Sequence, residues 1–194
     1  MLKEFTSAIR PAIVLTILFA VLLGLVYPLA LTGIGQAVFP HQANGSLIRE
    51  GDKVIGSELI GQNFAAPKYF HGRLSAAGQG YDPTASSGSN LGPTSKVLHD
   101  RVQGDVAKLH SETPGQSVPA DLVTTSASGL DPDISPEAAL FQVDRVAKAR
   151  GIAKNDVEAL IERNTEQPIG GFIGEQHVNV LALNRALDRL PVHP

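Results

Sequence analysis

The chain has no cysteine, no tryptophan and one methionine among its 194 residues. Without cysteine it can form no disulfide, offer no thiolate ligand to zinc and use no thiol nucleophile. Charge is also scarce, because Asp, Glu, Lys and Arg make up 18% of the residues and the formal net charge is −3. A nearly neutral chain lacks the basic surface that nucleic acid attracts, so we expect no nucleic-acid partner.

The missing charge is concentrated in one segment near the N-terminus. No charged side chain occurs from Pro11 to Pro40, and 17 of the 20 residues from Ala12 to Leu31 are apolar. A helix of 20 residues rises about 30 Å, which matches the hydrocarbon layer of a membrane. A core helix is rarely apolar on every face, and a secretory signal is shorter and ends at a small-residue cleavage site. We therefore predict an uncleaved anchor in membrane lipid, with Pro11 in its first turn and Pro28 near its far end.

The flanking charges predict the orientation of this anchor. Lys3, Arg10 and the amino terminus precede the segment, and the next cation is Arg49. Positive charge is enriched on the cytoplasmic side of membrane helices. The predicted parts are a cytoplasmic N-terminus at 1–11, a transmembrane helix at 12–31 and an extracytoplasmic domain at 32–194.

The domain after the anchor is expected to have an α+β fold, with strands early and helices late. A hairpin is predicted from strands at 46–48 and 54–55, and a further strand at 122–125. Residues 72–93 are rich in Gly and Ser and form a long loop of the kind that binds, makes contacts or moves. A flexible linker is the alternative, although Tyr81 and Leu91 are typical of anchored turns.

Capping residues and apolar periodicity predict four helices in this domain. Each begins at a polar cap and presents one apolar stripe to the core. Leu140 and Val143 belong to the stripe of the second helix, which also has proline at its first position and glycine after its end. The predicted caps are Ser95 (or Thr94), Ser135, Asn155 and Asn179, and the predicted ends of the second and fourth helices are Gly151 and Pro191.

The polar residues do not form a recognisable catalytic or metal-binding motif. The six histidines include no H-x-H or H-E-x-x-H pattern, and no G-x-S-x-G or phosphate-binding loop is present. We interpret Ser126, Ser128 and Ser89 as turn and cap hydroxyls. Asp131 and Asp133 are either paired carboxylates or parts of a turn before a helix. These residues favour an accessory membrane subunit, and the alternatives are an anchored extracytoplasmic hydrolase using a serine and a ligand-binding module.

Five runs of sequence make a more specific identification possible. In the same order along the chain, they resemble the C subunit of the Kdp potassium-transporting ATPase. The runs are YPLALTGIGQAVFPHQANGSLI (27–48), IGSELIGQNFAAPKYFHGRLSA (55–76), YDPTASSGSNLGPTS (81–95), DLVTTSASGLDPDISPEAALFQVDRVAKARG (121–151) and GEQHVNVLALNRALD (174–188).

The resemblance implies a non-catalytic subunit of a potassium uptake pump in the bacterial plasma membrane. Other subunits of such a pump form the potassium pore and hydrolyse ATP, and both are expected partners. The family is usually assigned the role of a catalytic chaperone that raises the ATP affinity of the hydrolysing subunit, so ATP is the implied cofactor and potassium the transported ion. The predicted orientation conflicts with direct nucleotide contact, because a domain outside the membrane does not meet cytoplasmic ATP. The second possibility is that the subunit stabilises the complex and the outer approach to the pore.

Within this family role, we expect three segments to contact other subunits. The helix at 12–31 packs on pump helices, and Gly24 within it and Gly33 just after it allow close approach. The loop 72–93 and the segment 124–133 contact the pore subunit. The candidate contact residues are Gly24, Gly33, Tyr81, Ser89, Asn90, Leu91, Ser126, Ser128 and Asp131.

Overall fold

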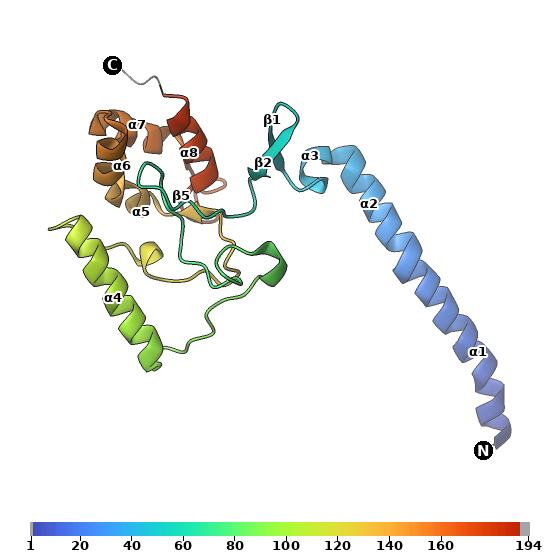
Figure 1. Ribbon diagram of the computed structural model, residues 1–194. Coiled ribbons are helices and arrows are strands. Elements are labelled where there is room, and N and C mark those ends of the chain that lie inside the picture. The colour runs from blue at the N-terminus through green and yellow to red at the C-terminus, as the bar shows by residue number, and fades with distance from the viewer. Residues whose placement is uncertain (1, 191–194) are drawn as a thin grey trace. The chain divides into compact units, whose positions relative to one another are not determined.

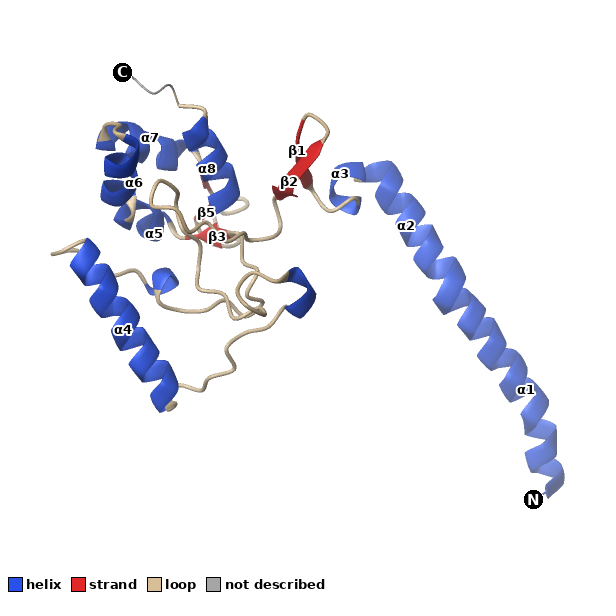
Figure 2. Ribbon diagram, viewed as in Figure 1, coloured by secondary structure: helices blue, strands red, loops and turns tan. Residues whose placement is uncertain are grey.

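A computed structural model describes residues 2–190, with side chains from Thr6 onward. The chain divides into two compact units, one that ends at Leu47 and one that begins at Ile48. The first unit is dominated by one long helix, and the second combines short helices, very short strands and long loops (Figures 1 and 2). The predicted α+β class is confirmed.

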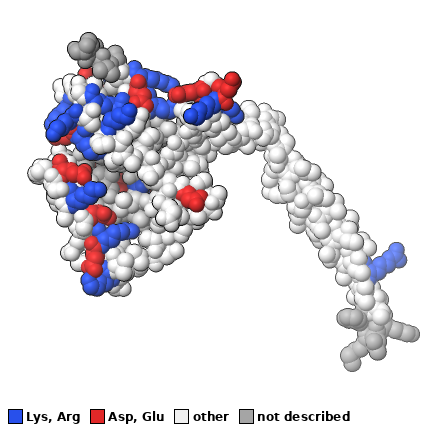
Figure 3. Space-filling model, viewed as in Figure 1, with Lys and Arg blue, Asp and Glu red and all other residues white. Residues whose placement is uncertain are grey.

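The long helix consists of α1 (Leu2–Val21), a π-helical turn (Leu22–Val26) and α2 (Tyr27–Val38), and one further turn, α3 (Pro40–Ala43), follows it. The 33 residues from Thr6 to Val38 are apolar enough to cross a membrane, and none of the most apolar stretch is buried within the protein. Figure 3 shows that this helix carries almost no charged side chains from Thr6 onward. It continues past the expected end at Leu31 and stops before Pro40, where Phe39 has the extended φ of −131° that a following proline favours.

Proline also explains the π-helical turn. Pro28 has no N–H, and its ring would clash with the Gly24 carbonyl four residues earlier. The helix widens there, and the Tyr27 N–H donates to the Leu22 carbonyl, five residues back instead of four. Pro11 lies inside α1, so its prediction as a first-turn residue was wrong. The preceding residues include Leu, Lys, Glu and Ala, which are good helix formers, and they extend the helix toward the N-terminus.

A hairpin of β1 (Leu47–Glu50) and β2 (Lys53–Ser57) follows the helical segment, as predicted. The turn between its strands is shorter than the predicted turn at 49–53. Gly51 and Asp52 alone connect the two strands, and Gly51 has a φ of +59°.

The second unit is built on a three-stranded antiparallel sheet in the order β3 (Asp133–Ile134), β5 (His177–Asn179) and β4 (Thr165–Glu166). Ile134 pairs with Val178, and Thr165 pairs with the same residue from the other side. Four helices complete the core: α5 (Pro136–Phe141), α6 (Val143–Arg150), α7 (Lys154–Arg163) and α8 (Val180–Asp188). Their apolar stripes bury Val146, Val157 and Leu183 completely, which makes one contiguous core.

Three of the four predicted helix caps are confirmed. The Ser95 hydroxyl accepts the Leu98 N–H at the start of α4 (Lys96–Glu112), and the Ser135 hydroxyl accepts the Ala138 N–H at the start of α5. The Asn179 side chain accepts the Ala182 N–H at 3.0 Å. Each cap pairs one of the N–H groups that a helix start leaves without a partner within the helix. The predicted stop at Pro191 lies outside the described residues.

Two predictions about the helical region were wrong. The segment after Ser135 forms two helices, α5 and α6, which meet at Gln142, and Leu140 is 47% exposed while Phe141 is buried. The side chain of Gln142 bonds to loop backbone, and this tertiary role decides where the helix breaks. Asn155 caps nothing, because α7 starts one residue earlier and Ala153 occupies the cap position.

The loops of the second unit contain little regular structure. The strand predicted at 122–125 is instead a 3₁₀ turn (Ala120–Leu122) followed by a single bridge between Thr125 and Leu74. That prediction was wrong because this segment pairs with an irregular loop. Such a loop forms a bridge at one residue and not the continuous ladder that a strand needs. A second 3₁₀ turn (Pro83–Ala85) lies in the long loop and begins where Asp82 accepts the Thr84 N–H.

Two buried side-chain amides clamp the middle of these loops to the helices. The Asn184 amide on α8 accepts the Phe70 N–H at 2.8 Å and donates to the Phe70 carbonyl at 2.9 Å. The Gln142 amide accepts the His71 N–H at 2.8 Å and donates to the His71 carbonyl at 3.1 Å. The backbone at these two residues is paired as it would be in a sheet, although its partners are side chains. We call this arrangement the amide clamp.

We expect Asn184→Ala to lower the free energy of unfolding by about 3 kcal/mol, because it leaves the buried N–H and carbonyl of Phe70 unpaired. Urea unfolding of the full chain in detergent, followed by circular dichroism, measures this change. The matched control is Asn155→Ala on the exposed side of α7, which should change the value by less than about 0.5 kcal/mol. Equal effects of the two substitutions would contradict the importance of the clamp.

Candidate functional site

The two loop segments predicted to make subunit contacts lie side by side. The Ser126 N–H donates to the Leu74 carbonyl at 3.3 Å, and the Ser87 N–H donates to the Ser128 carbonyl at 3.0 Å. The Ser75 hydroxyl donates to the Gly129 carbonyl at 2.6 Å. Residues 72–93 and 124–133 therefore form one connected surface, which we call the loop pair.

Gly129 lies where the two segments of the loop pair touch. It has a φ of +68°, and a β-carbon there would come within 2.8 Å of both Ala77 and the Ser87 carbonyl. Only glycine meets both the conformation and the close approach. Any larger residue at this position would force the two loops apart.

Tyr81 anchors the loop pair from within. Its side chain is half-buried, and its hydroxyl donates a short hydrogen bond to the Arg73 carbonyl. Burial raises the pKa of the Tyr81 phenol, and the nearby Asp131 carboxylate raises it further. The phenol is therefore neutral and works as a hydrogen-bond donor.

Asp131 connects the two loops through charge. Its carboxylate lies 3.0 Å from Arg73, and the two side chains are 29% and 27% exposed. Arg73 also donates to the Thr124 hydroxyl at 3.2 Å, and Asp131 accepts the Asp133 N–H at 3.1 Å. The interpretation of Asp131 as a turn residue agrees with this geometry.

The remaining loop candidates differ in exposure. Ser126 is 4% exposed, whereas Ser128 is exposed and its hydroxyl accepts the Leu130 N–H at 3.1 Å, as a turn serine does. Asn90 is exposed and has a φ of +52°, between the partly buried Ser89 and Leu91. Ser128 and Asn90 are therefore the most accessible of the predicted contact residues in the loops. The contacts themselves remain predictions.

The two glycines of the long helix do not lie on one face. They are nine positions apart, which is about two and a half turns, so they point to nearly opposite sides. A β-carbon at either would meet open space within the chain. Gly24 instead continues a ridge of small residues at four-residue spacing, formed with Ala12, Thr16 and Ala20.

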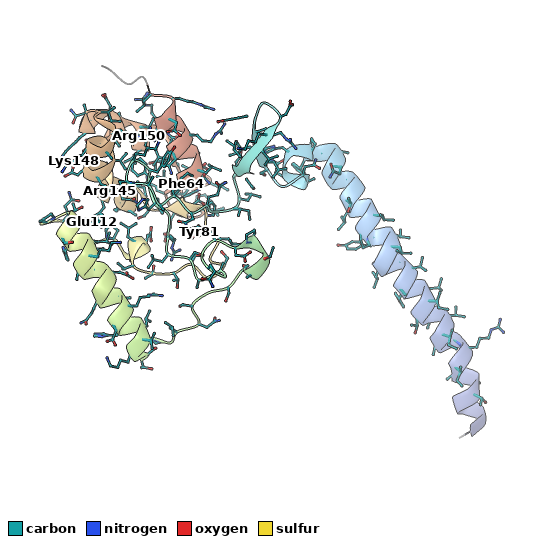
Figure 4. The ribbon with its side chains drawn as sticks, in the orientation of Figure 1. Phe64, Tyr81, Glu112, Arg145, Lys148 and Arg150 are labelled. Carbon is teal, nitrogen blue, oxygen red and sulfur yellow. The ribbon has the colours of Figure 1, made fainter. Side chains whose placement is uncertain are left out.

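The structure also contains a cleft that the sequence did not predict. It has a volume of about 820 Å³ and lies between the C-terminal half of α4, which has no buried residue, and helices α5 and α6. Figure 4 shows Glu112 of α4 near Arg145 and Lys148 of α6. The residues that line the cleft come from five separate segments, so no local sequence pattern could have indicated the cleft.

Two polar side chains of this cleft, Arg145 and Gln142, bond to the protein's own backbone. Arg145 donates to the Pro67 carbonyl at 2.6 Å and the Tyr69 carbonyl at 2.9 Å, and also to the Gln142 side chain. Burial lowers the pKa of Arg145, although the group stays charged because an arginine pKa is so high. Among the side chains described, from Thr6 to Leu190, no three His, Asp or Glu residues are grouped closely enough to hold a metal ion.

The pKa values of two histidines are shifted in opposite directions by their surroundings. Burial lowers the pKa of His71, and the neighbouring Arg145 charge lowers it further. On the sheet, a hydrogen bond to the Glu175 carbonyl raises the pKa of His177, with help from the Asp133 and Glu166 carboxylates. Burial also raises the pKa of the Asp133 carboxyl.

Within residues 2–190, the geometry defines a class of protein: a chain with one helix long and apolar enough to cross a membrane and a small α+β unit whose loops are bonded to each other. The family described as "KdpC: K+-transporting ATPase, c chain" matches residues 9–189, so the chain belongs to this family. The c chain is an accessory subunit and not the catalytic one.

Curated relatives align with this chain over nearly their whole length. A potassium-transporting ATPase KdpC subunit of Caulobacter vibrioides (strain NA1000 / CB15N) is 64% identical over 94% of this chain and 93% of the relative. The subunit of the same name from Rhodopseudomonas palustris (strain TIE-1) is 54% identical over 97% of this chain and 98% of the relative. The one from Bradyrhizobium diazoefficiens is 56% identical over the same shares.

We expect nuclear magnetic resonance titration to give a pKa below about 6.5 for His71 and above it for His177, in opposite directions from the unfolded value. His177 then contributes stability that is fully present below pH 6.5 and is lost as pH rises through its folded pKa. At His71 the unfolded chain binds the proton more tightly, so stability is lost as pH falls from about 6.5 through its folded pKa. His71→Gln and His177→Gln assign the two resonances, and shifts in the same direction would contradict this prediction.

Proposed function

We propose that this chain is the accessory subunit that assembles and stabilises an ATP-driven, high-affinity potassium uptake pump in the bacterial plasma membrane. One helix, with residues 12–31 in the bilayer, anchors it in a single pass. The N-terminus is cytoplasmic, and the domain from residue 32 onward lies outside. The partners are the potassium-pore subunit and the ATP-hydrolysing subunit.

The observation that supports this role best is the internal bonding of the loop pair. Its backbone, Tyr81 and the Arg73–Asp131 ion pair are already fixed in the isolated chain. A surface that is ordered before binding loses less conformational entropy when a partner docks. The loop pair therefore braces the outer side of the pore subunit.

The effect on ATP affinity implied by the resemblance is indirect in this proposal. A domain outside the membrane does not touch the nucleotide, so it acts by holding the pump in the assembled arrangement that binds ATP well. Differential contact with two states of the pump is sufficient to shift such an affinity. The chain itself supplies neither the phosphorylated residue nor the potassium path.

Cysteine substitution tests both the orientation and the contact, because the chain has no native cysteine. We expect Ser128→Cys in the assembled pump to react with a photo-crosslinker and join the pore subunit after illumination. In sealed cells lacking the partners, it should react with a membrane-impermeant maleimide. Exposed Glu158→Cys on α7 is the matched control: it should label equally well and crosslink at least about fivefold less. Labelling of Ser128→Cys only after permeabilisation would mean that the domain lies on the cytoplasmic side. Equal crosslinking of Ser128→Cys and Glu158→Cys would reject the loop pair as the contact.

The helix contact has its own test. Gly24→Leu fills the ridge of small residues that lets a neighbouring helix approach closely, and a β-carbon at this position meets open space within the chain. We expect co-purification with the pump to fall severalfold. Gly33→Leu tests the second predicted contact, which lies on nearly the opposite side of the helix. Val14→Leu, on neither of these two sides, is the control and should co-purify normally. Loss of co-purification with Gly33→Leu alone would assign the contact to the other face.

A further inference from the structure

The hairpin between β4 and β5 ends in an exposed apolar tip. Ile169, Phe172 and Ile173 are 76%, 81% and 57% exposed, and Phe172 is the most exposed large hydrophobic side chain among the described residues. No charged residue occurs from Gln167 to Gly174. Three large apolar side chains within five residues, all turned to solvent, are typical of a surface that another apolar phase covers. We call residues 168–174 the apolar tip.

The backbone of the apolar tip is largely paired with itself. The Ile169 N–H donates to the Ile173 carbonyl at 3.0 Å, and the Ile173 N–H donates back to the Ile169 carbonyl at 3.1 Å. The Gly171 N–H donates to the Pro168 carbonyl at 2.9 Å. Gly170 and Gly171 have φ values of +65° and +82°, which make this tight closure possible.

This internal pairing meets the requirement that a lipid environment imposes. In hydrocarbon no water is available to a free N–H or carbonyl, so a segment that enters it must satisfy its own backbone. A protein socket can supply partners and imposes no such requirement. Just below the tip, the side chains of Gln176 and Gln167 bond to each other at 2.8 Å. Glu166 precedes Gln167, and Glu175 lies between Gly174 and Gln176. The hairpin thus has an apolar tip on a polar and charged base, as an element that enters the membrane interface does.

A bilayer is also close to this unit. The helix that is apolar enough to cross a membrane ends at Val38, and Ile48, where the second unit begins, lies ten positions later. Ten residues reach at most about 35 Å. A tether this short keeps the local concentration of membrane surface high, so a weak apolar insertion is sufficient for binding.

We propose that the apolar tip inserts into the interfacial layer of the phospholipid bilayer and forms a second attachment of the folded unit to the membrane. The flanking glutamates repel anionic headgroups. The attachment therefore depends on contact with acyl chains and does not require anionic lipid. This attachment is independent of which side of the membrane the unit occupies and of the contact made by the loop pair.

A single tryptophan tests the insertion, because the chain has none of its own. The full chain carrying Phe172→Trp is reconstituted in phosphatidylcholine vesicles with or without brominated acyl chains. We expect a blue-shifted emission and at least about twofold quenching by the brominated lipid. Glu158→Trp, exposed on α7, should emit like tryptophan in water and stay unquenched. Leu25→Trp in the long helix must be quenched in the same vesicles, which separates failure of the tip from failure of the anchor.

The other occupants give different results. A blue shift without quenching by brominated lipid means burial against protein, such as a second copy of the chain, and overturns the proposal. In the assembled pump, the emission of the parent pump is subtracted to isolate the signal of the introduced tryptophan. If its quenching disappears when the other pump subunits are added, the tip contacts a partner subunit, and the proposal is also overturned. As a second measurement, Phe172→Cys should react with a maleimide at least about fivefold more slowly in vesicles than Ser128→Cys does. Equal rates would reject insertion.

Discussion

The amide clamp connects the loops of the second unit to its helical core. Asn184 lies on α8 and Gln142 lies at the junction of α5 and α6. Each nevertheless pairs both backbone groups of one residue in a consecutive pair, Phe70 and His71. Phe70 is fully buried, so its N–H and carbonyl have no access to water. Leaving such groups unpaired is far more unfavourable than the net gain from an average hydrogen bond. The core therefore closes only when both amides are in register with the loop.

The loop pair depends on this clamp for its position. Residue 72 follows the clamped pair directly, and Arg73, Leu74 and Ser75 then make successive bonds to the second segment. The loop 72–93 has too little apolar surface to fold by its own burial, and its long-range hydrogen bonds are formed only because both segments are held nearby. A preorganised surface made of Gly and Ser thus results from fixed ends and internal bonds.

The membrane helix and the folded unit follow different physical rules. From Thr6 to Val38, every large side chain of the helix is exposed to the surroundings, and one proline decides where the backbone widens. In lipid this apolar exterior is the stable arrangement, whereas the folded unit buries apolar side chains in a core. The apolar tip contains the two most exposed large apolar side chains among the described residues of the folded unit, Ile169 and Phe172, and its closed backbone gives it the same property that lets the helix reside in lipid.

The sequence by itself determined the features that depend on neighbouring residues. The apolar run, the hairpin and the caps at Ser95, Ser135 and Asn179 could be predicted because the interactions that form them lie within a few positions. The tertiary structure decided the helix break at Gln142, the lost strand at 122–125, the cleft and the pairing of the loops. Asn184 and Phe70 are 114 positions apart, and no local pattern indicates that such residues meet. Contacts over that separation depend on how the whole core closes, so they follow from the three-dimensional packing and not from the pattern of residues.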